Sequence, residues 1–79
     1  MQLTLFVTDD CSACGRAETK IKEVINGLDG VELNVKNIKE TKPQNVFIVP
    51  ALFIDNQLYL YGEVDSQKLA EKINSKFAG

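Results

Sequence analysis

The sequence contains no histidine and only two cysteines among its 79 residues. A structural metal site in a protein takes about four ligands. One chain offers only two thiolates, so the remaining ligands of a cysteine–histidine site would have to come from a second copy or an external thiol. Cys11 and Cys14 are also too close in sequence to link distant parts of the chain. This spacing excludes a secreted domain held together by a disulfide framework.

An excess of positive charge and long apolar runs are absent as well. The formal net charge is -2 and the nine basic residues are scattered, unlike those of DNA- or RNA-binding proteins. No apolar run approaches the roughly 20 residues of a membrane span, and residues 1–5 lack the charged start of a signal peptide. We therefore expect a soluble, cytoplasmic protein with no nucleic-acid or membrane partner, folded as one domain over residues 1–79.

What the chain does have is a pair of cysteines where an apolar strand-like segment gives way to a helix. The free N–H groups and the positive end of the dipole at a helix N-terminus stabilise a thiolate, so Cys11 is the better candidate nucleophile. Cys14 follows nearly one helical turn later on the same side. The two can therefore close a disulfide, which predicts dithiol–disulfide exchange with Cys11 attacking and Cys14 releasing the substrate.

Charged residues near Cys11 act in opposite directions. Asp9 and Asp10 disfavour a thiolate, whereas Arg16 and the helix terminus favour it. The two aspartates are most simply interpreted as a solvated loop and an N-cap. The lysines at positions 36, 39 and 42 are interpreted as a solvated face without a function.

The apolar periodicity predicts the elements of the first half of the chain. Residues Leu3–Thr8 are apolar on both faces, as in a central strand, and the following helix carries the cysteines and stops at Gly27 or Gly30. Residues Val31–Lys36 alternate in polarity like an edge strand. Residues 37–45 are polar and contain a proline, so at most a short helix fits there.

The second half predicts a hairpin and a helix. Ala51–Ile54 and Leu58–Tyr61 flank a turn and form the hairpin, and the last helix begins at Asp65 or Ser66. A βαβ unit requires parallel strands and a tight hairpin requires antiparallel ones. We therefore expect an α/β fold with a four-stranded mixed sheet, in which the two most apolar strands, Leu3–Thr8 and Ala51–Ile54, are central.

Together these features resemble the thioredoxin-fold superfamily, and the small glutaredoxin-like and thioredoxin-like proteins most. The Cys-Ser-Ala-Cys motif at residues 11–14 follows the first strand, Val49-Pro50 matches the family's cis-proline dipeptide, and Gly62 precedes the last helix. The resemblance covers essentially the whole chain. It implies a thioredoxin-like fold, βαβ followed by ββα, in which the middle helix is short or absent.

The resemblance also implies residue roles. Cys11 would attack, Cys14 would resolve, and a cis Pro50 would turn the backbone of Val49 toward an extended substrate segment. Proline is the residue for which a cis bond costs least, which gives this expectation a physical basis. The residues expected to bind substrate are Val49, Pro50, Ser12, Ala13 and Gly62.

Some positions depart from the family patterns. Leu5 stands where thioredoxins carry a buried acid that accepts the proton of the resolving thiol. Ile48 replaces the threonine that precedes Val-Pro in glutaredoxins, and Glu63 replaces the second glycine before their last helix. Because Glu63 places a negative charge where that family binds a carboxylate, glutathione stays an open question as a partner.

The expected function is that of an enzyme, a thiol–disulfide oxidoreductase that acts on protein disulfides in a reducing compartment. We expect it to need no cofactor, to be monomeric and to receive electrons from an upstream reductase. One alternative is a thioredoxin-fold protein-binding module without redox catalysis. Another is a dimeric metal or iron–sulfur carrier that uses the two thiolates.

Overall fold

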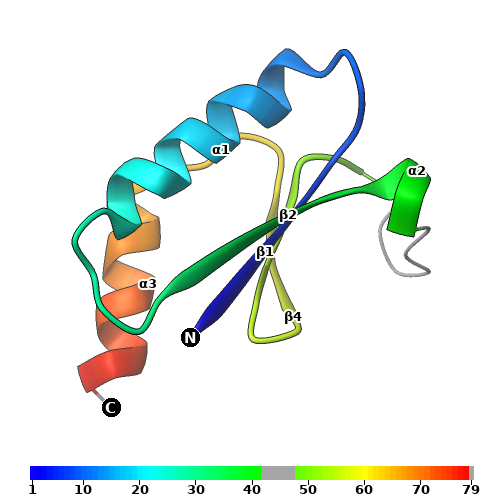
Figure 1. The fold of residues 1–79 in the computed structure, drawn as a ribbon. Helices are drawn as coiled ribbons and strands as arrows, with labels where there is room; N and C mark the ends of the chain where they lie inside the picture. The colour runs from blue at the N-terminus through cyan, green and yellow to red at the C-terminus, as the bar shows by residue number, and fades with distance from the viewer. Residues whose placement is uncertain (42–47, 79) are drawn as a thin grey trace.

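The computed structural model describes residues 1–41 and 48–78. The elements, in chain order, are β1 (Gln2–Val7), α1 (Ser12–Ile25), β2 (Glu32–Asn37), α2 (Ile38–Thr41), β3 (Ala51–Ile54), β4 (Gln57–Tyr61) and α3 (Ser66–Ala78) (Figure 1). The middle helix, α2, is thus a single turn, which confirms the expectation that at most a short helix fits in this polar segment. The following residues, 42–47, which include Pro43, lie outside the described residues. No described helix has both the length and the apolar character needed to cross a membrane.

The strands form one mixed sheet in the order β2-β1-β3-β4. β1 runs parallel to β2 and antiparallel to β3, and β3 and β4 form the antiparallel hairpin. This confirms the predicted α/β fold and the central position of the two most apolar strands. In the register, Leu5 of β1 lies between Val35 of β2 and Leu52 of β3.

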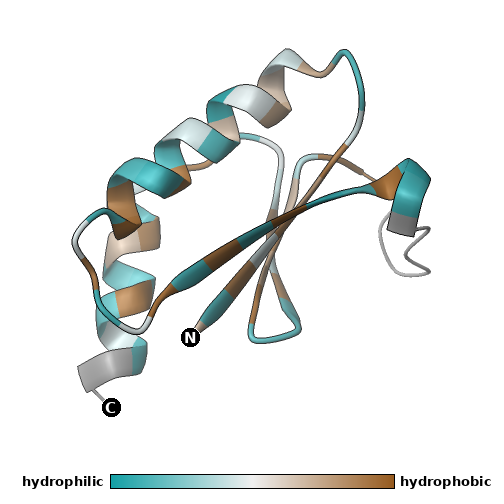
Figure 2. Ribbon diagram, viewed as in Figure 1, coloured by the Kyte–Doolittle hydropathy of each residue, from teal (hydrophilic) through white to brown (hydrophobic). Residues whose placement is uncertain are grey.

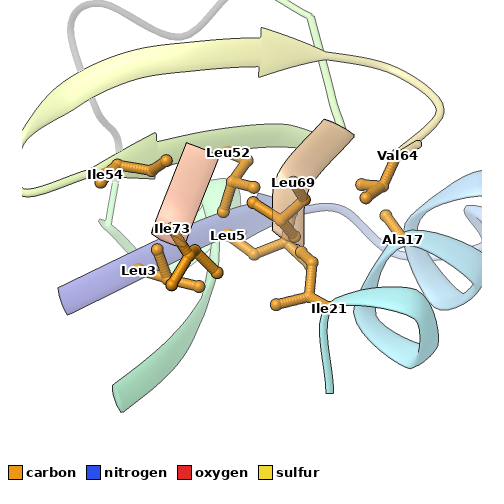
Figure 3. Packing of buried hydrophobic residues seen from close by; sticks show 9 residues of the cluster. All are labelled: Leu3, Leu5, Ala17, Ile21, Leu52, Ile54, Val64, Leu69 and Ile73. Atoms are coloured by element: carbon orange, nitrogen blue, oxygen red, sulfur yellow. The ribbon is translucent and has the colours of Figure 1, made fainter. Parts of the chain in front are cut away.

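The helices α1 and α3 lie side by side against one face of this sheet (Figure 1). Around each helix hydrophobic and hydrophilic positions alternate (Figure 2), as expected when one face packs on a sheet. The buried side chains converge between the helices and the strands (Figure 3); they are Leu3, Leu5, Ala17, Ile21, Leu52, Ile54, Val64, Leu69 and Ile73. This cluster fixes α1, and hence the cysteines at its start, on the sheet.

Side chains of the other sheet face include an aromatic pair. Phe6 of β1 and Phe53 of β3 meet edge to face, with 5.5 Å between the ring centroids. Successive residues of a strand point to opposite faces, so these two rings lie on the side away from Leu5 and Leu52. Both rings are half-buried.

The last helix starts as its sequence predicts. The Asp65 carboxylate accepts a hydrogen bond from the backbone N–H of Lys68 at 3.1 Å, which is the interaction of an N-cap side chain. The backbone carbonyl of Asp65 accepts the N–H of Leu69 at 2.9 Å. Asp65 therefore caps α3 and directs Leu69 into the core.

Candidate active site

The cysteines lie where the chain leaves β1 and enters α1. Asp10 has a φ of 55°, in the left-handed region that aspartate tolerates better than most residues. Cys11 follows with extended backbone angles and is itself the N-cap of α1. The expectation that Asp9 or Asp10 caps this helix is therefore wrong, because the chain turns at Asp10 and the helix starts one residue later.

Cys11 and Cys14 form a disulfide, with their Cα atoms 5.2 Å apart. The backbone N–H of Cys14 donates to Cys11 Sγ at 3.1 Å. Cys11 is partly exposed, whereas Cys14 is only 3% exposed. The two sulfurs thus differ as exchange chemistry requires: one can be reached from outside, and the other is buried behind it.

Pro50 lies at the same end of the sheet. The Val49–Pro50 bond is cis, as expected. Ala51 pairs with Phe6, so Pro50 lies beside the end of β1 that leads into the cysteine loop. Pro50 is buried and Val49 is half-buried.

Gly62 joins this group through a backbone contact. Its N–H donates to the carbonyl of Pro50 at 2.7 Å. The φ of Gly62 is +76°, which glycine adopts without strain. The structure therefore brings together two of the predicted substrate-binding residues, Pro50 and Gly62, that are distant in sequence.

The residue after Gly62 forms an ion pair that the sequence did not reveal. Glu63 Oε1 accepts from Arg16 Nε at 3.2 Å and from Arg16 Nη2 at 2.7 Å. Its other oxygen lies 3.7 Å from Lys20 Nζ. The hydrogen bond to Arg16 is the main cause that lowers the pKa of Glu63, and the same bond raises the pKa of Arg16. Arg16, which was expected to favour a Cys11 thiolate, thus also pairs with the Glu63 carboxylate.

A second set of polar contacts holds the loop before Cys11. Asp9 accepts hydrogen bonds from Asn37 Nδ2 at 3.0 Å and from Lys39 Nζ at 3.1 Å. The Lys39 hydrogen bond is the main cause that lowers the pKa of Asp9. Lys39, interpreted from the sequence as part of a solvated face, thus ties α2 to the cysteine loop. The pairing of β1 with β2 explains why these residues are close, because Asn37 pairs with Val7, two residues before Asp9.

The outer side of α1 carries an open groove of about 560 Å³. Its lining residues are Ser12, Gly15, Arg16, Thr19, Lys20 and Glu23. Ser12 is exposed between the two cysteines, and Ala13 is half-buried. The groove therefore begins at Ser12, between the two cysteines in the sequence, and runs along α1 past Arg16.

Two further observations concern groups that take up protons or metals. Leu5, at the position of the thioredoxin acid, is fully buried in the apolar core, so no acid stands at that point. Within residues 1–41 and 48–78, no three side chains of histidine, cysteine, aspartate or glutamate come together as metal ligands.

Comparison with known proteins finds the same fold. A family model described as thioredoxin domain matches residues 1–75. Thioredoxin 1 from the thermophilic eubacterium Thermosipho africanus TCF52B superposes with a TM-score of 0.78 at 21% identity, covering 99% of this chain and 96% of that one. A mutant thioredoxin from Halobacterium salinarum NRC-1 gives a TM-score of 0.68 at 23% identity, over 94% of this chain and 72% of that one. No curated protein matches the sequence.

Proposed function

Because the chain belongs to the thioredoxin domain family, we propose that it is a thiol–disulfide oxidoreductase that reduces protein disulfides. The observation that carries this proposal is the difference between the two sulfurs. Cys11 caps α1 and is partly exposed, and Cys14 is buried within disulfide distance of it. An accessible first sulfur and a protected second one are what a two-step exchange needs.

In the first step the Cys11 thiolate attacks one sulfur of the substrate disulfide. A bond forms between Cys11 and that sulfur, the substrate S–S bond breaks, and the other substrate sulfur leaves as a thiolate that takes up a proton. The N–H of Cys14, which donates to Cys11 Sγ, stabilises negative charge on the attacking sulfur. The first half of the substrate is then free.

In the second step Cys14 loses its proton and attacks Cys11 Sγ. The mixed disulfide breaks, the second substrate sulfur leaves and is protonated, and the Cys11–Cys14 disulfide forms. The substrate gains two electrons and two protons, and the protein loses them. An upstream reductase then returns the pair to the dithiol.

The substrate segment would lie along Val49, which precedes the cis Pro50 at the end of β1. An extended segment can add main-chain hydrogen bonds to an exposed backbone edge. Ser12 and Ala13 between the cysteines and Gly62 beside Pro50 would border it. We place this activity in the cytoplasm, in a monomer that acts as one domain over residues 1–79, because its chemistry needs a reducing compartment to regenerate the dithiol.

Two variants test the proposal by insulin reduction with dithiothreitol. Cys11→Ser removes the attacking sulfur, so the rate should fall to that of dithiothreitol alone. Cys14→Ser makes the same chemical change at the other sulfur, so the reduced variant, mixed with insulin after dithiothreitol is removed, should form a mixed disulfide that persists and is seen by mass spectrometry. Activity that survives in Cys11→Ser would overturn the proposed mechanism.

A further inference from the structure

Two cations and one carboxylate stand beside the disulfide, and we call them the charge cluster: Arg16, Lys20 and Glu63. Both guanidinium contacts of Arg16 go to Glu63 Oε1, at 3.2 and 2.7 Å. Lys20 Nζ lies 3.7 Å from Glu63 Oε2. All three side chains are about half exposed, so each can be reached by a molecule that approaches the site.

The charge cluster lies on the approach to Cys11. Arg16 is two residues after Cys14 and lines the groove that begins at Ser12. Glu63 is held beside this groove by its hydrogen bonds to Arg16, and it follows Gly62, whose N–H donates to the carbonyl of Pro50. A small disulfide that presents its sulfur to Cys11 thus brings its other groups near these charges.

Arginine binds carboxylates through paired N–H donors, and these donors are what a small carboxylate-bearing disulfide would use. In this chain Glu63 already occupies them and attracts Lys20 as well. An incoming carboxylate would have to displace Glu63 and would meet its negative charge. A neutral disulfide meets neither obstacle.

We propose that Glu63 determines specificity by occupying Arg16 and Lys20, so that the site discriminates against small anionic disulfides such as glutathione disulfide. The inference rests on the oxidoreductase function proposed above and specifies which small disulfides are poor substrates for it. The exchange itself is unchanged: Cys11 forms a mixed disulfide with one half and expels the other as a thiol, and Cys14 expels the second half. Two electrons pass from the cysteine pair to the small disulfide.

The test compares two small disulfides, the anionic glutathione disulfide and the neutral hydroxyethyl disulfide, in reaction with the reduced protein. The measured quantity is the ratio of their second-order rate constants. Glu63→Gln should raise the anionic-to-neutral ratio about two- to fivefold at low ionic strength, the range that exposed charge pairs produce. The gain should vanish near 1 M salt, where the Debye length is about 3 Å.

Two further variants act as controls. Glu18→Gln makes the same change on α1, at a carboxylate that pairs with Lys22 at 2.7 Å and not with the cations of the charge cluster, so the ratio should stay at the wild-type value. Arg16→Gln combined with Glu63→Gln removes the cation that the single change releases. The double variant should therefore lose most of the gain.

Three outcomes separate this proposal from the function on which it rests. A ratio in Glu63→Gln that equals the wild-type ratio, while both proteins exchange with the neutral disulfide, would overturn the specificity proposal alone. An equal gain in Glu18→Gln would also overturn it, because the effect would then be one of net charge. Failure of the wild-type protein to exchange with the neutral disulfide would overturn the oxidoreductase proposal and this one together.

Discussion

The two cysteines share one motif but have different surroundings. Cys11 is partly exposed and receives the N–H of Cys14, and Cys14 is 3% exposed. A thiol reacts through its thiolate and only where a reagent can reach it. The fold, more than the motif, therefore decides which sulfur meets the substrate.

This difference predicts selective alkylation. In the reduced protein, iodoacetamide should modify Cys11 well before Cys14, because burial protects the second sulfur. Mass spectrometry of Cys11→Ser and Cys14→Ser, each with a single thiol, gives the two rates. In denaturant the rates should become nearly equal, and a native Cys14 that reacts as fast as Cys11 would contradict the assignment of roles.

Among single residues, contacts between neighbours in the sequence could be predicted, whereas contacts between distant residues could not. Asp65 could be identified as a cap because capping depends on a few consecutive residues. The bond between Arg16 and Glu63 joins residues 47 positions apart, and the loop geometry that brings them together is not local. The same holds for Asp9 and Lys39, 30 positions apart.

At the scale of elements, α1 depends on α3. The first helix carries the cysteines, and the last helix packs beside it and places Leu69 and Ile73 in the shared core. Neither helix is long enough to be stable in water without this packing. The position of the cysteines is therefore set in part by residues near the other end of the sequence.

A substitution in α3 tests this dependence. Ile73→Ala should lower the free energy of unfolding by about 2–4 kcal/mol, because Ile73 is fully buried and the change leaves a cavity. Urea unfolding followed by circular dichroism measures the loss. The exposed Glu71→Ala in the same helix should change it by no more than about 0.5 kcal/mol, and similar losses in both variants would show that the packing of Ile73 is not the cause.

The strand order was predictable because burial leaves a clear signal in short strands. β1 and β3 are apolar on consecutive residues and are central, and β2 alternates and is an edge. The start of α1 was not predicted to the residue, because Asp10 takes a positive φ that many aspartates do not. This turn at Asp10 makes Cys11 the N-cap of α1.

For the whole molecule, two ion pairs tie distant segments together around the cysteine loop. Asp9 connects that loop to Lys39 in α2, and Glu63 connects the segment before α3 to Arg16 in α1. Both carboxylates have a lowered pKa in the folded state. Such groups stabilise the fold above their unfolded pKa, and this contribution is lost as the pH falls through the folded pKa.

A variant that lacks both carboxylates should therefore respond differently to acid. Asp9→Asn combined with Glu63→Gln should be slightly less stable than wild type above about pH 5, and the difference should shrink as the pH falls below the unfolded pKa values of about 4. The effect is small because both groups are exposed to solvent. Urea midpoints measured across this range give the difference, and one that did not change with pH would point to packing instead of charge.

The central position of β1 has a consequence for synthesis. This strand leaves the ribosome before its partners on both edges, β2 and β3, and before the helix residue Ile73 that joins Leu3 and Leu5 in the core. Until β3 is translated, one edge of an apolar strand stays open, and open edges invite pairing with other chains. The strand that leads into the cysteine loop is thus made before its partners and is enclosed only after they follow.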